Sequence, residues 1–161
     1  MKARPRRIEN QVAEQLTSHF VNMGMSPVKR IPVLGRAGPD IDINESGLAI
    51  DVKSRKEVPL GNYRFVGKRL VRVGEMLAVK VSDFPLIYSD VPTSEELSET
   101  KIVRGYLEHM AEWANRNGCI PAIVIHRPGT RVSNAVFIIY ARDREKLKEQ
   151  YETVIRRSSN N

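Results

Sequence analysis

Two aspartates and a lysine in the first third of the chain have types and spacing suited to chemistry. Asp40 follows a Gly-Pro pair, and Asp51 and Lys53 lie two positions apart in an otherwise apolar run. Side chains alternate between the faces of a strand, so Asp51 and Lys53 are expected on one face. If the two segments pair as a hairpin, Asp40 lies opposite them. Such a group can hold a hard divalent cation and activate a water beside a phosphate.

The simpler explanation is that these aspartates are solvated charges on half-exposed strands. Asp is disfavoured in strands, and Asp51 lies between two apolar residues, so an acid there lowers stability unless something binds it. Pro39 restricts the backbone before Asp40 and defines where that segment begins. We therefore favour a functional site over a solvated surface.

Composition indicates one globular domain over residues 1–161. The chain is 41% hydrophobic and 28% charged, which is ordinary for a protein that buries a core without disulfides. Cys119 is the only cysteine, and no zinc-ligand spacing occurs. The N-terminus does not resemble a signal peptide, and no apolar run is long enough to span a membrane. A cytoplasmic protein without a membrane partner is expected.

The charge balance favours a polyanionic partner. The net charge is +7, from 26 Lys and Arg against 19 Asp and Glu, and basic proteins bind nucleic acid through counterion release. No Gly-rich phosphate loop, nucleophile elbow or dinucleotide fingerprint is present, so no nucleotide cofactor is expected. His19, His109 and His126 match no metal or triad spacing and are expected to be structural.

Three segments are predicted to be helical. Apolar residues recur every four positions in 7–23, which predicts an amphipathic helix that stops near Gly24. A second helix follows an acidic stretch and ends at Asn117-Gly118. A charged helix over 143–157 closes the chain, and 158–161 is expected to be disordered.

The strand pattern predicts an α/β fold, with a mixed central sheet flanked by helices. Strands are expected at 27–34, 40–44, 48–54, 120–126 and 135–140. Residues 57–100 are expected to form an irregular insert, with short strands at 71–73 and 77–81. The basic residues of this insert suit either a DNA-binding arm or a dimer interface, and the sequence does not separate the two.

The run Gly38-Pro39-Asp40, followed by Asp51-Val52-Lys53, resembles the signature of the PD-(D/E)xK nuclease superfamily. Within it, the chain most resembles the archaeal-type Holliday junction resolvases and their phage-borne relatives. Those proteins begin with a basic segment and a helix carrying an acid, matched here by Arg6 to Val12 with Glu9 in the acid's place. The resemblance covers residues 4–56 and 102–141.

The resemblance implies a restriction-endonuclease-like core and a Mg²⁺- or Mn²⁺-dependent endodeoxyribonuclease of DNA recombination and repair. Glu9, Asp40, Asp51 and the Val52 carbonyl would hold the cation, and Lys53 would position water or stabilise charge on the phosphate. The partner would be a four-way DNA junction, cut by a homodimer whose two-fold symmetry matches it.

Several assignments stay open. Glu14 rivals Glu9 as the helix acid, but it lies about 140° around the helix, so only one can face the site. Asp42 is either a partner of Asp40 or half of a surface charge pair. Phosphate contacts, or solvated surface charges, are expected of Arg4, Arg6, Arg7, Arg36, Arg55 and Lys56.

Two alternatives accompany the resolvase hypothesis. One is another nuclease of the same superfamily, of restriction or repair type, which would need side chains that reach base edges. The other is a non-catalytic DNA-binding module on the same fold.

Overall fold

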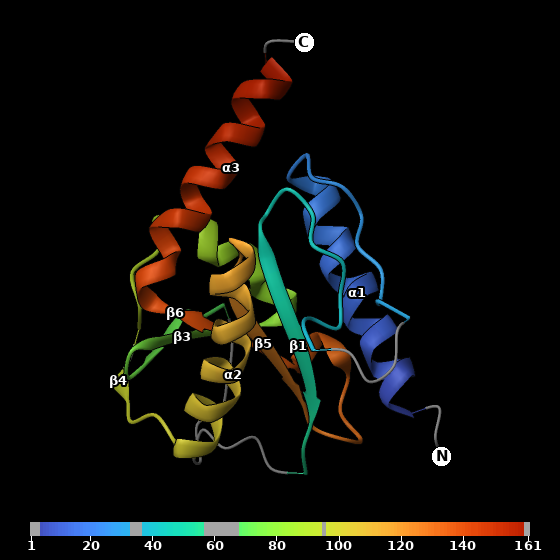
Figure 1. Ribbon diagram of the computed structural model, residues 1–161. Coiled ribbons are helices and arrows are strands. Elements are labelled where there is room, and N and C mark those ends of the chain that lie inside the picture. The colour runs from blue at the N-terminus through green and yellow to red at the C-terminus, as the bar shows by residue number, and fades with distance from the viewer. Residues whose placement is uncertain (1–3, 33–36, 57–67, 95, 160–161) are drawn as a thin grey trace.

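A six-stranded mixed sheet lies at the centre of the protein, with helices on both faces (Figure 1). The computed structural model describes residues 4–32, 37–56, 68–94 and 96–159. The strands, in the order in which they pair across the sheet, are β1 (Leu48–Ser54), β5 (Ile120–His126), β6 (Val136–Tyr140), β3 (Met76–Lys80), β2 (Val71–Val73) and β4 (Glu96–Leu97). The pairs β1/β5 and β2/β4 are parallel, and the others are antiparallel. This confirms the predicted α/β class with a mixed sheet flanked by helices.

One face of the sheet is covered by α1 (Arg4–Asn22), the 3-10 segment η1 (Val81–Tyr88) and part of α3 (Arg144–Ser159). The four-residue spacing of Val12, Leu16 and Phe20 places these side chains on one stripe of α1, where they are fully buried against the sheet. Two further 3-10 turns, η2 (Val132–Asn134) and η3 (Ala141–Asp143), flank β6.

The opposite face is covered by α2 (Lys101–Asn117). Thr100 caps its first turn by accepting a hydrogen bond from the Val103 N–H, and Gly118 ends it in the left-handed conformation, with φ 66°. In β5, Ala122 and Val124 face α1 while Ile123 faces α2. This apolar alternation on both faces explains why β5 is wholly buried and lies inside the sheet.

The strands expected at 27–34 and 40–44 are the main error of the sequence prediction. The described part of these segments forms only one isolated antiparallel bridge, between Arg30 and Ile41. Pro27, Pro32 and Pro39 each lack the N–H that a ladder needs, so regular pairing cannot develop. The expected hairpin is therefore absent, and β1 pairs with β5 instead.

The segment expected to be an irregular insert is integral to the fold where the structure describes it, from residue 68 onward. The predicted strands at 71–73 and 77–81 are present as β2 and β3, and β3 pairs along its length with β6. Phe84 of η1 is fully buried and makes edge-on contacts with Phe20 and Phe137. Residues 57–67 lie outside the described residues.

The C-terminal prediction needs a smaller correction. Ser158 and Ser159 belong to α3, which projects beyond the sheet (Figure 1), whereas 160–161 lie outside the described residues. In the described parts of the chain, no helix has the length and apolar character to cross a membrane.

Phe84→Ala tests whether η1 is part of the core. Removing this ring leaves a cavity between α1 and β6, and the free energy of unfolding should fall by about 3–5 kcal/mol. Urea denaturation followed by circular dichroism measures the change. Ile102→Ala, at a side chain that is 56% exposed on α2, should change it by less than about 0.5 kcal/mol. Equal effects of the two substitutions would contradict a packing role for η1.

Candidate active site at the edge of the sheet

Asp51 and Lys53 project from β1 on the face that α2 covers. The alternation of the strand sends Ile50 and Val52 to the opposite face, against the core under α1. The Lys53 Nζ lies 3.2 Å from the Asp51 Oδ2, and the two side chains are 32% and 16% exposed. A carboxylate and an ammonium thus stand side by side in a half-buried position, as their spacing predicts.

Asp40 lies along the free edge of β1 without forming a strand. Its N–H donates to the Ile50 carbonyl at 2.8 Å, and its Oδ2 accepts from the Val52 N–H at 2.8 Å. One backbone and one side-chain hydrogen bond therefore hold the carboxylate against the strand that carries Asp51. The N–H and C=O of a strand residue point to the same edge, so the Val52 carbonyl also lies at this edge.

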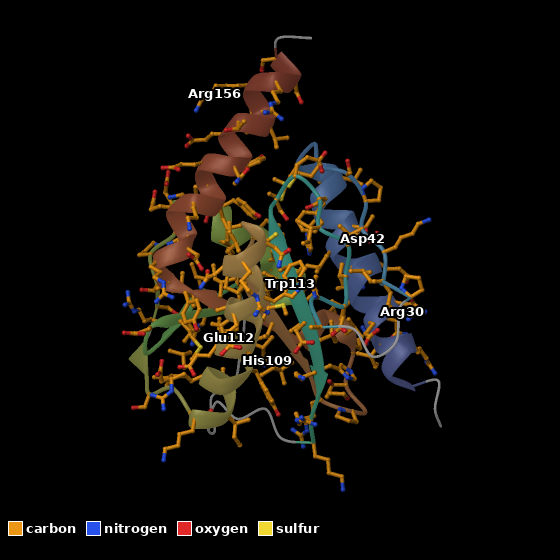
Figure 2. The ribbon with its side chains drawn as sticks, in the orientation of Figure 1. Arg30, Asp42, His109, Glu112, Trp113 and Arg156 are labelled. Atoms are coloured by element: carbon orange, nitrogen blue, oxygen red, sulfur yellow. The ribbon has the colours of Figure 1, made fainter. Side chains whose placement is uncertain are left out.

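The approach of Asp40 to β1 depends on the glycine two residues before it. Gly38 has φ 117°, and a Cβ built there would lie 2.9 Å from the Trp113 Nε1. Trp113 lies on α2 (Figure 2), is half-buried, and packs against the small apolar cluster that contains Ala49 of β1. The indole therefore fills the space that a side chain at position 38 would need, which accounts for glycine at the start of the Gly-Pro-Asp run.

Two carboxyl groups meet at this edge. Burial raises the pKa of Asp40 to about 7, helped by a hydrogen bond to the Asp51 carboxyl and by the negative charges of Asp51 and Glu9, while the Val52 N–H lowers it. A hydrogen bond between two carboxyl groups requires that one of them be protonated. Below about pH 7 the Asp40 carboxyl therefore keeps its proton, although the Lys53 ammonium lies 3.2 Å from the Asp51 Oδ2.

The electrostatics also bear on the two rival acids of α1. The charge of Glu9 acts on Asp40, whereas Glu14 is exposed and lines a pocket on another side of the helix. This geometry favours Glu9 as the helix acid. Asp42 is also exposed, and its carboxylate accepts from the Lys29 N–H at 3.2 Å, so it supports the loop rather than the Asp40 carboxylate.

The oxygen atoms gathered at the edge of β1 are of the type that binds a hard cation. Oxygen ligands from Asp40, Asp51 and the Val52 carbonyl are those that Mg²⁺ and Mn²⁺ prefer, and a divalent charge would relieve the repulsion that raises the pKa of Asp40. Among the described residues, no three His, Cys, Asp or Glu side chains are already arranged as ligands, so Glu9 does not complete a preformed triad.

Tyr106 of α2 is a site residue that the sequence prediction missed. The centroid of its ring lies 5.2 Å from the Lys53 Nζ and 5.3 Å from the Arg55 Cζ. Its hydroxyl accepts a hydrogen bond from the Arg55 Nε. Cations over an aromatic face are attracted by its quadrupole. Tyr106 therefore restrains both Lys53 and Arg55. The contact joins residues about 50 positions apart in the chain, so no local spacing in the sequence indicates it.

The proposed DNA-binding residues are placed unevenly. Lys56 and Arg7 are exposed, and Arg55 combines exposure with its bonds to Tyr106. Arg4 and Arg6 form the first turn of α1, and their side chains lie outside the described part of the structure, as does Arg36.

No protein-family model, no curated protein and no solved structure matches this chain.

Asp40→Asn tests the raised pKa of the Asp40 carboxyl in metal-free buffer. The pKa of Asp40 is raised from 3.8 to about 7, so the folded state binds the extra proton between these values. Stability of the wild type should therefore fall as pH rises through this window. The free energy of unfolding of the variant relative to wild type should rise by about 1–2 kcal/mol from pH 4 to pH 8, after discounting for solvent screening. Urea titrations at several pH values measure it.

Asp42→Asn is the matched control, since it removes an exposed carboxylate from the same segment. An equal pH response in this variant would contradict the specific pairing of Asp40 with Asp51.

Gly38→Ala tests the contact with Trp113. The added Cβ must displace the indole and adopt a positive φ, so the free energy of unfolding should fall by about 2–3 kcal/mol. Gly118→Ala is the control, because it also places a Cβ on a backbone with positive φ, here the milder left-handed region at 66°, with no atom within 4 Å of the added Cβ, and should lose about 1 kcal/mol. Calorimetry compares them, and equal losses would show that the Trp113 contact is unimportant.

Proposed function

We propose that this protein is a Mg²⁺- or Mn²⁺-dependent endodeoxyribonuclease of the PD-(D/E)xK type, with a restriction-endonuclease-like core, that resolves Holliday junctions. The observation that carries the proposal is the meeting of Asp40 and Asp51 at the edge of β1, with the Lys53 ammonium 3.2 Å from Asp51. Two acids and an amine gathered from separate segments onto one accessible edge suit hydrolysis of a phosphodiester.

Each residue of the candidate site has a separate role in the proposed reaction. Asp40 and Asp51 bind the cation with the Val52 carbonyl, and Glu9 adds negative charge from α1. When bound, the cation supplies Lewis acidity and lowers the pKa of water. Lys53 orients the attacking water or stabilises the negative charge that develops on the phosphate, and Tyr106 limits where its ammonium can lie.

The protonation of Asp40 links the site to pH. With a pKa of about 7, Asp40 must release its proton before both acids can act as anionic ligands. Cation binding should therefore strengthen as pH rises through 7.

The net charge supports DNA as the substrate. The chain carries +7, and the exposed Arg7 and Lys56 flank the segments that form the site. Contacts of this kind reach phosphates and carry no base code, which suits an enzyme that reads the shape of branched DNA. Two copies related by a two-fold axis would place one site on each of two opposed strands.

A non-catalytic DNA-binding module is the second candidate. It is favoured by the lack of a preformed group of three ligands among the described residues. Such a module would bind DNA through exposed basic residues such as Arg7 and Lys56, and the carboxyl pair would have a structural role only.

The test compares a labelled four-way junction with a linear duplex of the same arms, with Mg²⁺ and with EDTA. Wild type should make paired, symmetric nicks near the crossover only when Mg²⁺ is present. Asp51→Asn should lower the rate by at least about 100-fold while it retains DNA affinity, because it removes a ligand without removing the basic surface. Asp42→Asn, outside the pair, should retain cleavage.

Each other outcome has a clear meaning. Equal cutting of the duplex would keep the nuclease and reject the resolvase. Tight binding of either DNA without cutting, in Mg²⁺ or Mn²⁺, would reject the enzyme in favour of the binding module.

A further inference from the structure

A pocket of about 800 Å³ lies between the N-terminal half of α1 and the β5–β6 loop. It is lined on the helix by Arg7, Ile8, Gln11, Glu14 and Gln15, on the strand ends by Ser54 and His126, and in the loop by residues 128–133. Ser54 follows Lys53 on β1, and Ile8 precedes Glu9 on α1. The pocket therefore shares β1 and α1 with the candidate active site but contains none of its acids.

The polar lining of this pocket combines two cations with two amides. Arg7 and Arg131 are exposed, and they approach from α1 and from the loop, respectively. Guanidinium groups bind phosphate oxygens with two parallel hydrogen bonds. Gln11 and Gln15 offer both donors and acceptors, and the Glu14 carboxylate is an additional acceptor. The set fits a ligand with a phosphate and a neutral polar edge.

His126 supplies the observation that points to a ligand. The residue is 3% exposed, and its Nε2 lies 2.9 Å from the Thr130 carbonyl oxygen. A carbonyl only accepts, so Nε2 must carry the hydrogen, and Nδ1 of the neutral ring is then a bare acceptor. This buried Nδ1 has no hydrogen-bond partner among the described residues. Buried acceptors are nearly always paired, so this Nδ1 is suited to accept a hydrogen bond from an amino, imino or hydroxyl group of a ligand.

The volume of the pocket limits the size of the ligand that it can hold. Pockets of about 300–1,000 Å³ hold molecules of nucleotide size. A base in a duplex cannot present its hydrogen-bonding edge to such a pocket, because the edge is paired and the faces are stacked. An unpaired nucleotide offers a phosphate for the guanidinium groups and a free base edge with N–H donors.

We propose that this pocket binds one unpaired nucleotide of the DNA strand that passes the Asp40–Asp51 pair. The phosphate contacts Arg7 and Arg131, and an N–H of the base edge donates to the His126 Nδ1. The inference rests on the proposed function only in naming DNA as the polymer.

This assignment gives the site a physical basis for preferring DNA with unpaired or easily unpaired bases. Unpairing and unstacking a base from a duplex costs a few kcal/mol, and that cost is lowest where bases are already unpaired. A protein that must place one nucleotide in this pocket would therefore favour DNA whose bases are unpaired or easily unpaired over a regular duplex, without reading a base sequence.

The first test measures binding of the four deoxynucleoside monophosphates, without metal, by titration calorimetry and by the imidazole NMR signals of His126. We expect saturable binding of at least one nucleotide, with the His126 signals shifted. Arg131→Ala should weaken binding by about tenfold through loss of charged hydrogen bonds, and Gln11→Ala by about threefold. Neither substitution alters a buried residue, so both variants are expected to fold.

Two controls separate this pocket from general charge and from the active site. Arg156→Ala removes the same charge from the far end of α3 (Figure 2) and should leave nucleotide affinity unchanged. Asp51→Asn should also retain it, because Asp51 does not line the pocket.

The outcomes distinguish the pocket from the catalytic proposal. Nucleotide binding without any DNA cleavage would uphold the pocket and reject the nuclease. Junction cleavage with no saturable nucleotide binding, or with no shift of the His126 signals, would overturn the pocket while the nuclease stands. Equal weakening by Arg131→Ala and Arg156→Ala would show non-specific attraction and would also overturn it.

Discussion

The close approach of two carboxyl groups at the free edge of β1 is the constraint on which the rest of the site depends. Burial raises the pKa of Asp40 to about 7, and the hydrogen bond to Asp51 and the negative charges of Asp51 and Glu9 add to the shift. The Val52 N–H and the Ile50 carbonyl hold Asp40 in place despite this repulsion. An arrangement that lowers stability and is nevertheless held by specific hydrogen bonds is typical of a functional site.

The helices α1 and α2 make different contacts with the residues at this edge. On the face of α2, Trp113 fills the space beside Gly38, and Tyr106 restrains Lys53 and Arg55. On the other side, α1 directs the charge of Glu9 toward Asp40 and exposes Gln11 to the neighbouring pocket. The proposed metal site and the proposed nucleotide pocket therefore share one helix and use different faces of it.

The sheet explains why this edge is available. Because β5 is apolar on both faces, it lies inside the sheet, between β1 and β6. The strand β1 therefore lies at the edge of the sheet, with a partner strand on one side only. The other side of β1 is met by a proline-containing segment that forms few backbone hydrogen bonds. Polar side chains and the Val52 backbone can therefore occupy a position that a regular strand would otherwise cover.

The sequence by itself determined the features that depend on local periodicity. The three helices, β1, β5 and β6, and the shared face of Asp51 and Lys53 follow from spacings of about four and of two residues. Only the tertiary structure decided which strands pair, that proline would reduce the expected meander to one bridge, and that β3 is part of the sheet. It also brought Tyr106 to Lys53 and His126 to the pocket, because such contacts join residues far apart in the chain that no local spacing relates.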